Sequence, residues 1–172
     1  RLTTCAQPDA DTAAPAETAV PAPCFYPMEV PMAEENIRLL LRSEISDDGS
    51  QERELDERSL PGVLRARGGS FLLTYTEAGE GGEVQSELLC TDGKIRLCRR
   101  GAIRSEILFS EGGVHRSLYE IPPYRFDMVV TTEGIRYAFD GGAGEIDLIY
   151  RTELGGALRH CRLTLRVSPD DR

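Results

Sequence analysis

Apolar and polar residues alternate with a period of two along most of the chain. In the first clear run, Ile37, Leu39 and Leu41 fall on one face, while Arg38 and Arg42 fall on the other. Successive side chains of a β-strand point to opposite faces, so this pattern predicts a strand with one buried face. No stretch shows a convincing 3.6-residue period, and the chain is therefore predicted to be all-β.

The same alternation returns in later runs, each with polar residues between its apolar ones. These runs are Phe71, Leu73 and Tyr75; Ile95, Leu97 and Arg99; Ile107 and Phe109; Phe126, Met128 and Val130; Ile135, Tyr137 and Phe139; Ile146, Leu148 and Tyr150; and Cys161, Leu163, Leu165 and Val167. Residues 51–67 form a more polar run that we expect to be interrupted at Pro61-Gly62.

Turn-forming residues separate these runs. The predicted turns are Asp47–Ser50, Gly79–Gly82, Thr91–Gly93, Gly112-Gly113, Glu133-Gly134, Gly141–Gly144 and Gly155-Gly156, and Pro122-Pro123 is expected to interrupt strand pairing. About eight to ten antiparallel strands joined by hairpins are typical of an up-and-down barrel or a sandwich. The one-faced pattern favours the closed barrel, because closure removes exposed strand edges.

The first 35 residues differ from the rest of the chain. Six of the ten prolines fall in residues 1–31, and no apolar periodicity is present there. Such a segment cannot bury enough surface to offset its ordering entropy. We therefore predict a disordered extension over 1–35, a barrel domain over 36–168 and a short tail over 169–172. MAEENIRLLL suggests that translation starts at Met32.

Composition narrows the possible functions. The chain has 172 residues, 40% of them hydrophobic, and no apolar run reaches the roughly 20 residues of a membrane-spanning helix. Its net charge of -9 disfavours nucleic acid and anionic lipid as partners. The arginine-rich last strand, with Arg159, Arg162 and Arg166, is therefore interpreted as a solvated face.

The five cysteines do not form a recognisable metal or disulfide framework. Their number is odd, and no C-x-x-C spacing occurs. This pattern predicts that the cysteines are reduced thiols and that the protein is cytoplasmic. We also expect it to hold no metal and no cofactor. His115 and His160 are the two histidines, and no set of nucleophile, base and orienting group can be assembled around them. We therefore do not expect an enzyme.

A spaced set of residues in the second half resembles a known family. Its elements are Arg99-x-Gly101-x-x-x-Ser105-x-Ile107-x-Phe109-x-x-Gly112, then Leu118-Tyr119-x-x-Pro122, then Phe126-x-Met128-x-x-Thr131; Asp47-Asp48-Gly49 and Tyr75-x-Glu77 also fit. Over residues 36–168 this set resembles the YwiB-like family of uncharacterised bacterial proteins. The resemblance implies a calycin-type barrel, the architecture of lipocalins and fatty-acid-binding proteins, and it implies no activity. Ile121-Pro122-Pro123-Tyr124 departs from the family's usual Thr-Pro-Tyr-Gly turn.

Two charged residues continue apolar faces toward the interior. Glu77 follows Leu73 and Tyr75 on one face, and Arg99 follows Ile95 and Leu97 on another. A buried charge is costly unless it is paired. If both face the interior, we predict an Arg99–Glu77 distance of about 3 Å. Either these residues close one end of the barrel or reach solvent at its rim, or they bind a ligand. Arg100, Arg104 and Arg116 are expected to be exposed.

Two functional hypotheses follow. The first is a non-enzymatic barrel that binds a small molecule through Tyr75, Glu77, Arg99 and Tyr119. The second is a filled barrel that acts as a protein-interaction module through its outer arginine-rich strands or the Pro122-Pro123 loop; its protein partner is not indicated by the sequence. An interior cavity of about 300 Å³ or more would favour the first hypothesis, and an interior packed with side chains would favour the second.

Overall fold

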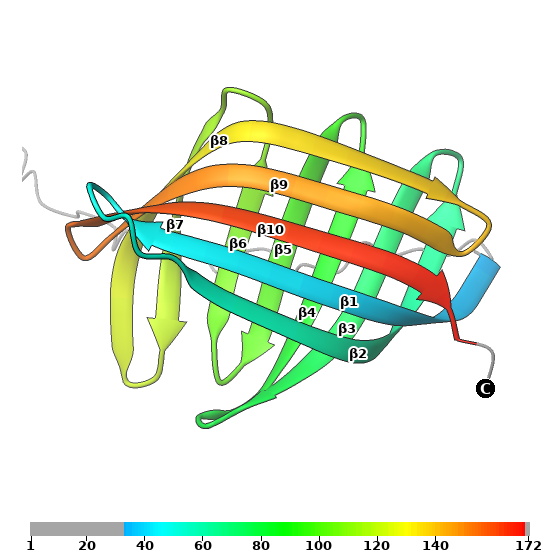
Figure 1. The fold of residues 1–172 in the computed structure, drawn as a ribbon. Helices are drawn as coiled ribbons and strands as arrows, with labels where there is room; N and C mark the ends of the chain where they lie inside the picture. The colour runs from blue at the N-terminus through cyan, green and yellow to red at the C-terminus, as the bar shows by residue number, and fades with distance from the viewer. Residues whose placement is uncertain (1–32, 171–172) are drawn as a thin grey trace, which may run out of the picture.

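Residues 33–170 are described by a computed structural model, and they form one closed antiparallel barrel (Figure 1). Its ten strands are β1 (Ala33–Asp47), β2 (Glu54–Arg67), β3 (Ser70–Gly79), β4 (Gly82–Thr91), β5 (Lys94–Gly101), β6 (Arg104–Phe109), β7 (Val114–Ile121), β8 (Tyr124–Asp140), β9 (Ala143–Leu154) and β10 (Ala157–Pro169). Each strand pairs with the next along the chain, and β1 pairs with β10. The predicted all-β, up-and-down barrel is confirmed.

Closure joins the two ends of the described chain. The β1–β10 ladder runs from Ile37 opposite Pro169 to Asp47 opposite Arg159, and the Asp170 amide donates to the Asn36 carbonyl at 3.0 Å. In Figure 1, β1, β2 and β8–β10 form a front layer that crosses the steeper strands β3–β7 behind it. Within residues 33–170 no helix is present, and hence none that could span a membrane. The predicted extension before residue 33 lies outside the described residues.

The alternating apolar positions face the barrel interior, as predicted. The largest side chains with less than 2% exposure are Phe109, Ile37, Leu39, Leu73, Leu88, Ile95, Leu97, Ile146, Leu148, Leu165, Val130 and Thr132. All but Thr132 are apolar, and the aliphatic and aromatic members pack as a single core cluster. Burial of this apolar surface is the main force that stabilises the barrel.

The predicted turn at Glu133-Gly134 is wrong. β8 continues through this point with a β-bulge between Thr132 and Gly134. The bulge adds one residue to the strand, so the inward face changes from even positions such as Val130 to odd positions such as Ile135. In the sequence, the apolar positions change from even to odd residue numbers at this point, which indicates a bulge. Gly134 was instead interpreted as part of a turn.

The predicted interruption of β2 at Pro61-Gly62 is also wrong. Pro61 pairs with Arg38 and Gly62 pairs with Tyr75 within continuous ladders. A Cβ at Gly62 would lie 2.8 Å from the Thr74 carbonyl oxygen, so glycine is required there by close strand packing. Pro122-Pro123 does separate β7 from β8, as predicted.

Gly101 ends β5 in a conformation that L-residues rarely adopt. Its φ is +111°, and a Cβ would collide with the Glu83 carbonyl oxygen. Gly93 also has a positive φ, +71°, but has no atom within 4 Å of its Cβ position. We expect Gly101→Ala to lower the free energy of unfolding by at least about 1 kcal/mol more than Gly93→Ala, because it adds a clash to the backbone strain. Urea unfolding of both variants measures the difference. Equal losses of unfolding free energy would show that β4 and β5 can move apart to accommodate the added methyl group at no cost.

Candidate functional site

A row of directly opposed residues crosses five strands on the inner face of the barrel. Tyr75 on β3 lies opposite Ser86 on β4, Ser86 opposite Arg99 on β5, Arg99 opposite Ser105 on β6, and Ser105 opposite Tyr119 on β7. Large and small side chains alternate along this row, so each serine lies between two long neighbours. Tyr75, Arg99 and Tyr119, which sequence analysis predicted to bind a ligand together with Glu77, therefore belong to one site, called the polar row below.

Within residues 33–170, the polar row contains buried polar atoms without hydrogen-bond partners. These atoms are the Tyr75 hydroxyl, Ser86 Oγ, Arg99 Nε and Ser105 Oγ; Ser117 Oγ on β7 and Thr132 Oγ1 on β8 share this property. Exposure is 3% for Tyr75, 0% for Ser86 and 8% for Ser105. Buried polar groups in proteins are nearly always hydrogen-bonded, so a cluster of such atoms on one inner surface marks a candidate binding site.

Two tyrosines from opposite walls lie within the electrostatic influence of Arg99. Burial raises the pKa of Tyr75 to about 12, and the charge of Arg99 opposes this rise. Burial also raises the pKa of Tyr150 on β9, again against the effect of Arg99. Ser86 approaches the Tyr75 hydroxyl, but without the distance and angle of a hydrogen bond. Both phenols are therefore neutral at pH 7 and can donate a proton in a hydrogen bond.

The predicted ion pair between Arg99 and Glu77 is wrong. Glu77 lies opposite Val84, one inward position nearer the strand end than Tyr75, and its carboxylate is 3.9 Å from Nη1 of Arg58. Arg58 also contacts Asp56 at 2.7 Å. Among residues 33–170, Arg99 forms no ion pair. The register thus places the Glu77 charge with Arg58 at the rim and leaves Arg99 without a counter-ion.

Sequence reasoning missed several members of this site. Arg58 lies opposite Leu41, which places it on the inner face, but the polar sequence of β2 gave no signal of which face was buried. Ser86 and Ser105 were detectable as small polar residues at inward positions of largely apolar strands. Arg104 and Arg116 are exposed as predicted, whereas Arg100 is half-buried.

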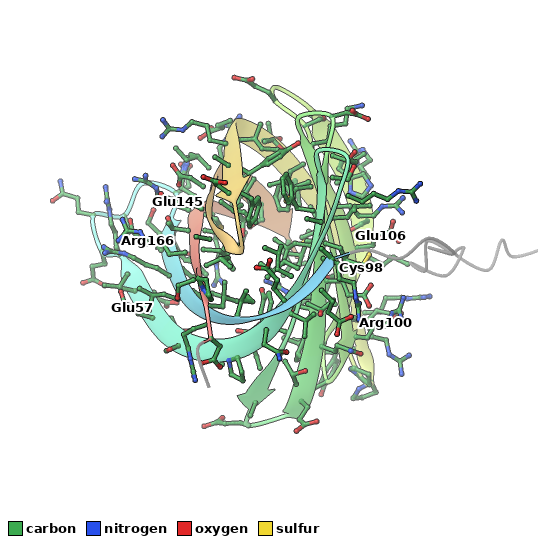
Figure 2. All side chains as sticks on the ribbon, turned by 90° about the vertical axis from the view of Figure 1, so that its right-hand side faces the viewer. Glu57, Cys98, Arg100, Glu106, Glu145 and Arg166 are labelled. Atoms are coloured by element: carbon green, nitrogen blue, oxygen red, sulfur yellow. The ribbon has the colours of Figure 1, made fainter. Side chains whose placement is uncertain are left out.

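A second polar cluster lies on the outer face around Asp147. Arg162 donates to both carboxylate oxygens, at 3.0 and 3.1 Å, and Arg136 donates at 3.2 Å. Beside it, a groove of about 260 Å³ is lined by Leu40, Arg42, Glu44, Glu57, Glu145, Arg162, Thr164 and Arg166. Figure 2 looks into the barrel end and shows Glu57, Glu145 and Arg166 on one outer wall, opposite Cys98, Arg100 and Glu106. The mixed charges of the groove satisfy one another, which indicates a structural network.

Asp147 is expected to stabilise the fold in a pH-dependent manner. Its hydrogen bonds from Arg162 hold the pKa of the carboxyl below its ordinary value of 3.8. A lowered folded-state pKa gives stability that is present above the ordinary value and is lost as pH falls through the folded value. Asp147→Asn should therefore lower the unfolding free energy by about 1 kcal/mol at pH 7 and by less at pH 3. Urea unfolding measures the loss, with Asp127→Asn at an exposed position as the control. If the loss of unfolding free energy in Asp147→Asn is the same at pH 7 and pH 3, the lowered pKa of Asp147 is contradicted.

The reactive side chains of the described residues are engaged elsewhere or buried. His115 Nδ1 accepts from the Leu108 amide at 3.3 Å, and His160 Nε2 lies 3.0 Å from Asp48. Burial raises the pKa of the Cys90 thiol to about 12, which disfavours the nucleophilic thiolate. Within residues 33–170, no group of three or more His, Cys, Asp or Glu side chains is arranged to hold a metal. The polar row is therefore suited to binding through hydrogen bonds and charge.

Comparisons with known proteins agree with the fold. The uncharacterized beta-barrel protein YwiB of Bacillus subtilis (strain 168) is 25% identical over 124 residues, which cover 72% of this chain and 86% of that protein. A crystal structure of the ywiB protein from Bacillus subtilis matches with a TM-score of 0.70 at 24% identity, covering 80% of this chain and 95% of the other. The model of the Domain of unknown function (DUF1934) family matches residues 40–165. The chain therefore belongs to the DUF1934 family of β-barrel proteins.

Proposed function

We propose that the barrel binds a small molecule at the polar row and does not catalyse a reaction. The observation that carries this proposal is the set of partner-free polar atoms on Tyr75, Ser86, Arg99 and Ser105, which face the interior side by side. Each unsatisfied buried group costs about 1–3 kcal/mol. A ligand that supplies their hydrogen-bond partners would recover this free energy on binding.

The architecture supports a calycin-like binding role by analogy. A barrel of about eight strands can just hold one small ligand, and the diameter grows with the number of strands. The ten strands of this chain therefore provide a wider frame around the polar row. Because one fold supports many functions, the polar row itself, and not the fold, supports the binding function. We also propose a reducing, cytoplasmic location, which the free thiols of Cys90, Cys98 and Cys161 support.

Native mass spectrometry after incubation with a small-molecule extract of the source organism tests the binding function. We expect a bound molecule that is released on unfolding. Ser86→Leu should abolish its capture, because the added side chain fills the space beside Arg99. Ser59→Leu makes the same change at an exposed position and should have no effect. Capture that survives Ser86→Leu, or no capture by the natural protein, would refute binding at the polar row.

A second candidate function is self-association through the β7–β8 hairpin. Large apolar residues are exposed on both faces of this hairpin. Leu118 (41%) lies on the outer face, and Ile121 (42%), Tyr124 (66%) and Phe126 (38%) lie near Pro122-Pro123 on the face that Tyr119 shares. The outer face also carries both charge signs, including the Arg125–Glu120 pair at 2.7 Å. A contact between two identical surfaces requires this kind of self-complementarity.

The oligomeric state tests this second candidate. We expect sedimentation velocity to detect a dimer, and we expect Leu118→Ser with Tyr124→Ser to convert it to a monomer. Leu55→Ser changes an exposed leucine on β2 and is the matched control. A natural protein that stays monomeric at millimolar concentration would rule out a second copy as the occupant of this surface.

A further inference from the structure

We propose that the molecule bound at the polar row is a short oxyanion, a carboxylate or phosphate compound, held by Arg99 between Ser86 and Ser105. This inference rests on the proposed binding function and adds to it the charge and the size of the ligand. It follows from three properties of the site: an unpaired positive charge, a set of hydrogen-bond donors around it, and an interior that is filled beyond it.

The local charge at Arg99 favours an anion, while the Glu77 charge acts on Tyr75 at the β3 end of the row. Glu77, the acidic residue nearest along β3, lies 3.9 Å from Arg58, which also pairs with Asp56. Arg99 has no ion pair within the described chain, and its Nε is buried. Arg99 is half-buried, and a partly buried cation is stabilised by an opposite charge, so an anionic ligand gains more from this position than a neutral ligand of the same shape.

The donors around Arg99 match the geometry of an oxyanion. A guanidinium can donate from Nε and one Nη in parallel to two oxygens of a carboxylate or phosphate. Ser86 and Ser105 lie directly opposite Arg99 on its two neighbouring strands, and each has a partner-free hydroxyl. Tyr75 adds a phenol that its raised pKa of about 12 keeps protonated. The site therefore offers donors from three sides.

The interior beyond the polar row limits the size of the ligand. Two residues deeper along the strands, a second row of directly opposed residues is apolar and nearly inaccessible: Leu73 (0%), Leu88 (0%), Leu97 (1%) and Ile107 (4%). Further along the same strands, Ile95 lies opposite Phe109, and both have 0% exposure. These side chains occupy the path that a long hydrocarbon tail would take. Phe126 lies opposite Tyr119 at the β8 end of the polar row and is 38% exposed, so we place the approach to Arg99 at that end of the row.

Defined probes test the charge and the size separately. Titrations at constant ionic strength use acetate, benzoate and inorganic phosphate as short anions, benzamide as the neutral counterpart of benzoate, and laurate as a long-chain carboxylate. We expect at least one short anion to bind saturably and to shift the NMR signals of Arg99 Nε and of the Ser86 and Ser105 amides. Acetate and phosphate distinguish a carboxylate site from a phosphate site.

Variants locate the binding. Arg99→Met should lower the affinity for the anion at least tenfold, and the double variant Ser86→Ala with Ser105→Ala should lower it severalfold. Arg96→Met removes an arginine from the outer face of the same strand, where Arg96 pairs with Glu106 at 3.2 Å, and should change binding less than twofold. Amide spectra of each variant confirm that the barrel is folded.

Several results would overturn the inference. Equal affinities for benzamide and benzoate would show that charge is not recognised, and laurate binding inside the barrel would show that the interior accepts a long chain. The inference is also overturned if none of the short anions binds. If native mass spectrometry still captures a molecule in these cases, the binding function stands and only the ligand class is wrong. If capture also fails, both proposals are refuted.

Discussion

Leu97→Ala is expected to lower the free energy of unfolding by about 2–5 kcal/mol. Leu97 has 1% exposure and lies between Leu88 and Ile107 in the apolar row of the barrel. Its truncation removes buried apolar surface and leaves a cavity, because ladders on both sides hold the neighbouring backbones in place. Urea unfolding followed by circular dichroism measures the loss.

The exposed Leu55 is the matched control for this change. It has 58% exposure at the start of β2, so Leu55→Ala should alter the unfolding free energy by less than about 0.5 kcal/mol. Similar small losses for both variants would contradict a packed interior at Leu97 and would reopen the possibility of a long cavity along the barrel axis. The measurement therefore also tests the size limit inferred for the ligand.

The sequence predicted the faces of most strands because burial imposes a strict period of two. Leu163, Leu165 and Val167 on β10 show this clearly, since each has at most 5% exposure and the residues between them face outward. The strand at Ile135 was predicted with the right inward face but the wrong boundary. Periodicity reports which side chains are buried, and it does not distinguish a bulge from a turn where the parity changes.

The candidate site was predictable in part. Arg99 was visible as a charged residue that continues an apolar face, Tyr75 as a member of an apolar face, and Tyr119 through the family resemblance. Their alignment in one row was not, because it depends on the register of four consecutive ladders, which turn lengths and bulges determine. The same limitation produced the wrong pairing of Arg99 with Glu77, since both residues face inward but occupy different rows.

The two halves of the interior have different physical roles. The apolar half, which includes Leu88, Leu97 and Phe109, supplies hydrophobic stability. The polar row contains groups that are desolvated without compensation, including the Arg99 Nε and the Ser105 hydroxyl. Residues that bind a ligand commonly reduce the stability of the unliganded protein, so the cost of the polar row is expected if it is a binding site.

Arg99→Met is therefore expected to raise the unfolding free energy of the unliganded protein by about 1–3 kcal/mol. Methionine keeps an unbranched side chain in the same space and removes the buried Nε that has no partner. Arg96→Met, on the outer face of β5, should give no gain, because it removes a surface pair with Glu106 at 3.2 Å. Urea unfolding in a buffer without carboxylate or phosphate measures both changes.

Addition of a bound anion should stabilise the natural protein more than the Arg99→Met variant and so reduce the stability difference between them. A ligand that binds the folded state alone raises the unfolding free energy in proportion to the logarithm of its concentration, so the natural protein gains about 2.7 kcal/mol at 100 times Kd. The variant, whose binding is at least tenfold weaker, should gain at most about 1.4 kcal/mol at the same concentration, because it lacks the guanidinium. A loss of stability in the unliganded Arg99→Met protein would instead show that Arg99 holds the barrel end together, and equal gains in both proteins would place the anion away from the polar row.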